Sequence, residues 1–192
     1  MEPNRALDDL KAIRDIMDRT QKASGGESGW FLVVGGLNWV VGFMGQQFLP
    51  QRLAGWLWVV SNVITVAAII WLGVRSSSTN SVSSPLWRPI LAMPGTILLF
   101  DLAVIWLFEL QELEQIILIV VLSFALGFLQ LGLFFSPLIA TVGALLGVLA
   151  VAAYALIPGL FFAAIGLLGG GLMIYGGALM IRSGRSAGQE GA

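Results

Sequence analysis

Six apolar segments, each long enough to span a bilayer as a helix, constrain this chain more than any other feature. A helix of about 20 residues is about 30 Å long, which matches the hydrocarbon core of a membrane. A membrane β-barrel would instead show alternating segments of about half that length, and none is visible. The sequence therefore predicts an all-α integral membrane protein with a bundle of six transmembrane helices. The predicted spans are residues 30–49, 55–74, 90–110, 116–135, 138–157 and 160–181.

Charge is sparse throughout the chain. Only 11% of its 192 residues are charged and 57% are hydrophobic, whereas a soluble domain is about a quarter charged. We therefore expect one membrane domain over residues 29–182, in contact with the lipid bilayer, between an N-terminal segment (1–28) and a tail (183–192). The net charge of −1 argues against nucleic acid as a partner, because no basic field is present to displace counterions.

The residue types that carry most catalytic chemistry are missing, since the chain has no Cys and no His. This excludes disulfides, zinc sites with Cys or His ligands, and Ser-His or Cys-His catalytic pairs. Asp101 and Glu109 share the third predicted span but lie about 12 Å apart along it, too far for a two-carboxylate site. We expect no catalytic residue, no metal and no cofactor, and therefore no enzyme.

The distribution of Lys and Arg predicts the orientation of the spans. With six spans, the N-terminal segment, the loop at 75–88 and the tail share one side, and Arg52 is the only one of the ten basic residues on the other. Cytoplasmic loops carry the excess of Lys and Arg. Both termini are therefore expected in the cytoplasm.

Residues 1–28 predict an amphipathic helix that ends at Gly25-Gly26. Apolar positions recur every three or four residues and form a heptad-like seam. The seam packs on the cytoplasmic ends of its own bundle, on a protein partner or another copy, or on lipid. Its polar face is balanced in charge, which disfavours lipid because helices that bind membranes are usually basic there. The seam includes Leu10, Ile13 and Met17.

The run IRDIMDRT at residues 13–20, followed by Ser28-Gly29-Trp30 and a Gly-rich first span, resembles the start of a group of small bacterial inner-membrane proteins that are polytopic and have no settled activity. The likeness is confined to the first span and the segment before it. It implies a bacterial inner membrane and six spans, and it implies no catalytic residue.

Four polar side chains occupy similar central depths in different spans. An acid at membrane depth is costly, so it marks a functional-site hypothesis. One interpretation is a polar path for protons or ions. The other is a structural network of interhelical hydrogen bonds, in which amide side chains satisfy the acid. The four residues are Asn38, Asn62, Asp101 and Gln130.

Glycine is concentrated in the predicted spans, where small residues four apart let helix backbones approach closely. The motif GW-x-x-VV occurs at residues 29–34 and again at 55–60. The two helices run in opposite directions, so an inverted repeat is conceivable. Chance recurrence is favoured, because six residues recur easily in a chain rich in Val and Trp.

The leading interpretation is a non-enzymatic integral inner-membrane protein. It is a membrane-embedded subunit or interaction module that presents its N-terminal helix to a protein partner or, as a homo-oligomer, to another copy. The alternative is a small transporter or channel that uses Asp101.

Overall fold

The computed structural model describes residues 29–79 and 87–189. This part of the chain is helical and contains no strand. The predicted N-terminal helix, with Leu10, Ile13 and Met17, lies outside the described residues. The helices are Gly29–Phe48 (helix 29–48), α2 (Gln51–Thr79), α3 (Trp87–Leu107), α4 (Leu113–Phe135), α5 (Pro137–Leu156), η1 (Pro158–Leu160), α6 (Phe161–Ala164), η2 (Ile165–Gly170) and α7 (Gly171–Gln189).

Within residues 29–79 and 87–189, five helical stretches are long and apolar enough to cross a membrane, so the chain is a multi-pass membrane protein, as predicted. The apolar part of α3, Gly95–Leu107, is shorter. The count of six spans therefore stays a prediction that depends on α3. The five stretches are Gly29–Phe48, Gln51–Leu72, Leu113–Leu133, Pro137–Leu156 and Pro158–Ser183.

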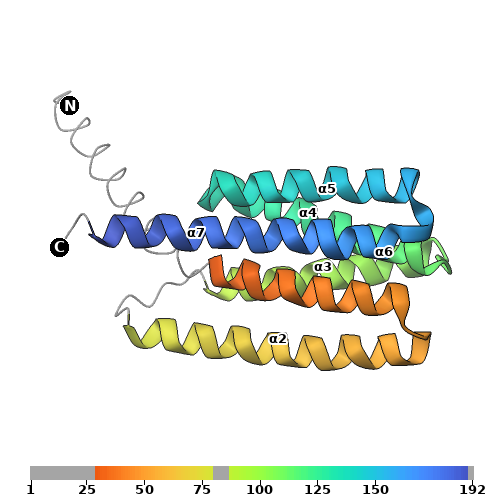
Figure 1. Cartoon of the computed structure of the whole chain (residues 1–192), viewed down its shortest axis with the longest axis horizontal. Coiled ribbons are helices and arrows are strands. Elements are labelled where there is room, and N and C mark those ends of the chain that lie inside the picture. The colour runs from red at the N-terminus through yellow and green to blue at the C-terminus, as the bar shows by residue number, and fades with distance from the viewer. Residues whose placement is uncertain (1–28, 80–86, 190–192) are drawn as a thin grey trace.

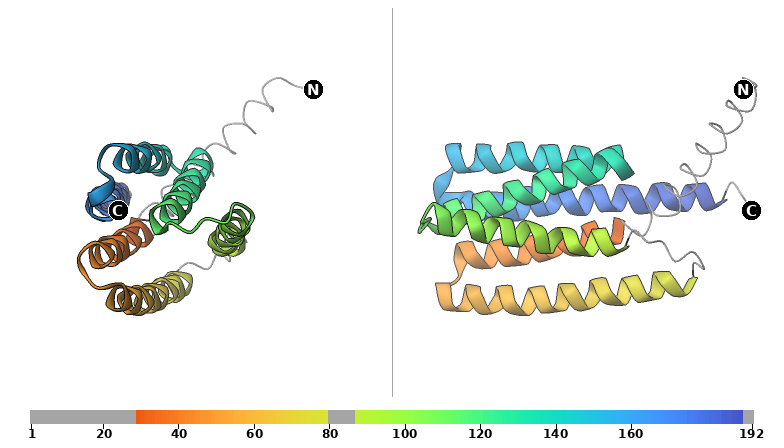
Figure 2. Two further views of the ribbon diagram at one scale, coloured as in Figure 1. Left: turned by 90° about the vertical axis from the view of Figure 1, so that its right-hand side faces the viewer. Right: turned by 180° about the vertical axis from the view of Figure 1, so that it is seen from behind.

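The helices run roughly along one common axis, with α5 and α2 at opposite edges (Figure 1). α4 and α5 form a closely packed hairpin, and α3 packs beside α4 (Figure 2). In the most apolar window of the last stretch, Pro158–Ser183, 50% of the residues are buried, against 11% in that of Gln51–Leu72. The last stretch is therefore a central element, and α2 is a peripheral one.

Two glycine doublets, Gly169-Gly170 and Gly176-Gly177, let the last stretch fit between two neighbours. The doublets are seven residues apart, so they lie two turns apart on the same side of the helix. The first glycine of each doublet faces α5. A Cβ atom added to Gly169 would lie 2.9 Å from Leu146 Cδ1, and one added to Gly176 would lie 2.8 Å from Val142 Cγ2.

The second glycine of each doublet faces helix 29–48. A Cβ atom on Gly170 would lie 2.7 Å from the carbonyl oxygen of Gly36, and one on Gly36 would lie 2.6 Å from the oxygen of Gly170. Gly29 and Gly177 meet in the same reciprocal way. Since the residue number rises along one helix as it falls along the other, the two helices are antiparallel, and their backbones touch at both pairs.

This contact joins two copies of one sequence pattern. Residues 29–40 and 170–181 both read G-x-x-x-β-x-G-G-x-x-x-β, where β is Val or Ile. In each copy the β-branched residue packs beside the partner's glycine. The other similarity, between residues 29–34 and 55–60, does not correspond to a close helix contact of this kind, because a Cβ atom on Gly55 would meet nothing within 4 Å.

Helix 29–48 is fixed to its other neighbours by aromatic and polar contacts. Measured between ring centroids, Phe43 lies 5.0 Å from Trp58 of α2, and Trp39 lies 6.2 Å from Phe124 of α4. At the end of the helix, Gln47 Nε2 donates to the Gly159 carbonyl at 3.0 Å, and Gln47 Oε1 accepts from the Ala163 N–H at 3.3 Å. Gln47 thereby satisfies one of the backbone N–H groups left open at a helix N-terminus.

Candidate functional site

Asp101 lies on the side of α3 that packs against α4. Its neighbours in sequence, Phe100 and Leu102, are 61% and 62% exposed, whereas Asp101 is 1% exposed. Positions four before and four after it, Ile97 and Ile105, are half-buried. The helical period therefore gives α3 one contact face with the acid in its middle.

The partner of Asp101 is a hydroxyl group on α4. Ser123 Oγ donates a hydrogen bond to Asp101 Oδ1 at 2.6 Å, and Asp101 Oδ2 is buried without a partner among the described residues. Sequence reasoning missed Ser123. Counting about 1.5 Å per residue from the cytoplasmic end of each predicted span places Ser123 and Asp101 at nearly the same depth. This match in depth is the feature of the sequence that indicates Ser123 as a partner.

Asn38 and Asn62 form a second polar pair, between helix 29–48 and α2. Asn38 Nδ2 donates to Asn62 Oδ1 at 3.3 Å, and Asn62 Nδ2 donates to the Trp58 carbonyl at 2.8 Å. Asn38 is 9% exposed and its Oδ1 is buried without a partner among the described residues. Asn62 is exposed.

The four predicted residues thus do not share one hydrogen-bond network in the described part of the chain. Asn38 and Asn62 bond to each other, and Asp101 bonds to Ser123 instead of to an amide. Gln130 is exposed on α4 and belongs to neither pair. Hydropathy gives the depth of a residue but not the side of the helix on which it lies, and this is why the predicted set contained residues that face different ways.

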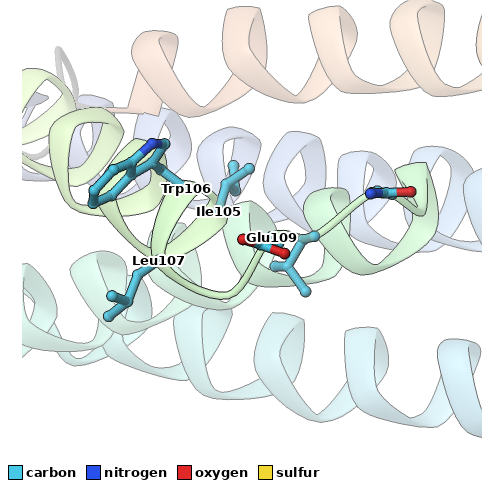
Figure 3. A pocket seen from close by; sticks show the side chains of 6 residues that line it. Ile105, Trp106, Leu107 and Glu109 are labelled. Atoms are coloured by element: carbon cyan, nitrogen blue, oxygen red, sulfur yellow. The ribbon is translucent and has the colours of Figure 1, made fainter.

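A pocket of about 440 Å³ lies at the C-terminal end of α3, beside the turn that leads to α4. Glu109 lies outside α3, although the third predicted span runs to residue 110, because α3 ends at Leu107 and Glu109 has a φ of 50°, in the left-handed region. Figure 3 shows that the Trp106 ring and the Glu109 carboxylate point in different directions, so they do not converge on one ligand. The lining residues are Ile105, Trp106, Leu107, Glu109, Leu110 and Gln111.

A second pocket, of about 630 Å³, lies along α4 and α5 and is lined by apolar residues such as Leu122 and Val148. Asp101 lines neither pocket. The buried carboxyl and its hydroxyl partner therefore join α3 to α4, and the geometry gives the acid no contact with either space.

No protein-family model, curated protein or solved structure matches this chain.

Proposed function

We propose that the chain is a non-enzymatic integral protein of a bacterial inner membrane. It acts as a membrane-embedded subunit or interaction module and presents its N-terminal amphipathic helix to a partner or to another copy. The burial of Asp101 is the observation that carries this choice. An acid that works in transport needs access to water or to an ion, whereas this one is 1% exposed and bonded to Ser123.

In this proposal α3 also crosses the membrane, which brings the number of spans to six. Its 21 residues, Trp87–Leu107, have the length of a transmembrane helix. Ser123 lies at the centre of the candidate span Leu113–Leu133, so its bond to Asp101 supports a mid-membrane position for α3 as well. With six spans, both termini lie in the cytoplasm, where the N-terminal helix is available to soluble or membrane-bound partners.

The proposal is tested by the mass of the protein in mild detergent, together with the identity of any chain that purifies with it. We expect the wild-type protein to be larger than one chain. Ile13→Glu, which places a charge on the apolar seam, is expected to lower this mass, because the partner or copy that the seam holds is lost. Ala12→Glu adds the same charge on the polar side of the predicted helix and should leave the mass unchanged. A wild-type protein that is a single chain without partners would contradict the proposal.

The alternative, a small transporter or channel, has one observation in its favour. Asp101 Oδ2 is buried without a partner among the described residues, so the carboxyl has a hydrogen-bonding position that Ser123 does not occupy. Proton flux into vesicles that contain the purified protein tests this alternative. A flux that Asp101→Asn abolishes, in a variant that remains folded, would favour the transporter over the interaction module.

A further inference from the structure

A polar side chain lies on the exposed side of α2 in the middle of a membrane span. The span is Gln51–Leu72, and Asn62 is at its centre and exposed. An amide group has two N–H donors and two acceptor positions on its oxygen. Asn62 donates once, to the Trp58 carbonyl, and accepts once, from Asn38. One donor and one acceptor position therefore remain, at a depth where no water satisfies them.

Most residues of α2 around Asn62 are exposed, and those on the same side of the helix as Asn62 form a seam. Gly55, Val59, Asn62 and Val66 are separated by four, three and four residues, which is the spacing of the contact positions in a coiled coil. All four are exposed. We name these four residues the α2 seam. A Cβ atom on Gly55 would meet nothing within 4 Å, so this end of the seam is open to close approach by another helix.

Beside the hydrogen bond from Asn38 to Asn62, α2 contacts helix 29–48 through residues that are not part of the α2 seam. Cβ atoms added to Gly42 and Gly45 of that helix would meet the side chains of Trp58 and Leu57. Val59 and Val66 are exposed and a Cβ atom on Gly55 would meet nothing within 4 Å, so helix 29–48 leaves most of the α2 seam uncovered. A single Asn within an apolar seam is also the device that sets register and the number of helices in coiled coils.

We propose that the α2 seam binds the α2 seam of a second copy of this chain, with the two helices parallel and related by a two-fold axis along the membrane normal. All copies insert with the same orientation, so each Asn62 lies at the same depth as its counterpart. The donor left on one Asn62 then matches the acceptor left on the other. An unrelated helix would need a polar residue of its own at this depth. The inference rests on the proposed function as an interaction module and adds a second interface, within the membrane.

Cysteine cross-linking tests this interface directly, because the chain contains no Cys of its own. Val59→Cys and Val66→Cys place a thiol on the α2 seam. Val60→Cys is the matched control: the residue type is the same, and the exposure is 52% against 54% for both seam positions. Val60 lies about 100° around the helix from Val59. We expect oxidation with iodine in native membranes to give disulfide-linked dimers at 59 and 66 and few at 60.

The role of the amide is tested in the Val66→Cys background. Asn62→Leu should lower the cross-linked fraction about three- to tenfold, which is the range for an interhelical hydrogen bond in a membrane. Asn62→Gln keeps an amide and should retain most of the cross-link. Asn38→Leu removes the internal partner of Asn62 and should leave the cross-link in place. An unchanged cross-link in Asn62→Leu would overturn the pairing of the amides.

Two results would overturn the dimer itself. One is equal cross-linking at all three positions, which indicates random collision, and the other is no cross-linking at 59 and 66. Neither bears on the mass in detergent. A protein larger than one chain that fails to cross-link at the seam would leave the proposed function standing and remove only the α2 interface.

Discussion

Asp101 has a single hydrogen-bond donor in the described structure, and this makes the two members of its pair unequal. A Ser hydroxyl that loses its acceptor can turn to the carbonyl four residues earlier on its own helix. A buried carboxyl that loses its donor has no such substitute. Removing one partner of a buried polar pair costs the desolvation of the group that stays behind. The two deletions should therefore differ in effect.

We predict that Ser123→Ala lowers stability more than Asp101→Leu does. Ser123→Ala leaves the buried carboxyl without a donor, at a cost of about 1–3 kcal/mol. Asp101→Leu removes one interhelical bond, a loss of about 1 kcal/mol, and Asp101→Asn keeps an acceptor for Ser123 and should stay close to wild type. Thermal unfolding in detergent measures the stability of all three variants.

The variant with both Ser123→Ala and Asp101→Leu should be no less stable than Ser123→Ala alone, since its carboxyl is gone. An Asp101→Leu protein as stable as wild type, together with a harmless Ser123→Ala, would show that the bond contributes nothing.

At the scale of the element, glycine determines which helices touch. The doublets of the last stretch give one glycine to α5 and one to helix 29–48, so a single helix fits closely between two others. Lipid is as apolar as the side chains, and helices in a membrane therefore associate largely through close packing. The antiparallel contact between residues 29–40 and 170–181 follows this rule, and it brings the first and last described stretches of the membrane domain together.

We predict that Gly36→Ala destabilises the bundle by about 1–3 kcal/mol, the usual cost of adding a group to a packed contact. The added Cβ atom would lie 2.6 Å from the Gly170 carbonyl oxygen, which is backbone and cannot turn aside. Gly171→Ala is the control, because its Cβ atom would meet nothing within 4 Å. Thermal unfolding of both variants in detergent measures the difference. Equal midpoints for the two would mean that helix 29–48 is not held against the last stretch as described.

At the scale of the whole molecule, the turns were predictable and the helix faces were not. Ser136 and Pro137 predict the break that separates α4 from α5, and Pro158-Gly159 predicts the end of α5. The spans of 116–135 and 138–157 agree closely with Leu113–Phe135 and Pro137–Leu156. These limits follow from local rules, since Pro and Gly interrupt a helix wherever they meet it.

The pairing of polar side chains depends instead on how each helix is rotated about its axis. A span exposed to lipid on most sides has little contrast in hydropathy between its faces, so its sequence does not reveal which side is inside. Gln130 was predicted to join Asp101 and is exposed, whereas Ser123, on the same helix, makes the bond. The sequence also does not predict the π-helix Ile165–Gly170, because no local sequence pattern distinguishes a π-helix from an α-helix.

The last prediction concerns α3 and the orientation of the whole molecule. If α3 crosses the membrane, residues 108–112 lie on the opposite side from residues 75–88 and from the tail. Fusions to alkaline phosphatase, which is active only outside the cytoplasm, distinguish the cases. We expect activity for fusions after Arg52 and after Glu112, and none after Thr79 or after Ala192. The Arg52 fusion is the control, because it follows helix 29–48 alone.

The same low activity after Glu112 as after Thr79 would mean that α3 stays on the cytoplasmic side. Asp101 would then lie outside the hydrocarbon core, although Ser123, its partner, is ten residues from each end of the candidate span Leu113–Leu133. The bond of 2.6 Å to Ser123 holds the acid at the depth of that central residue. We therefore expect α3 to reach the middle of the membrane, and its 21 residues are enough to carry the helix across.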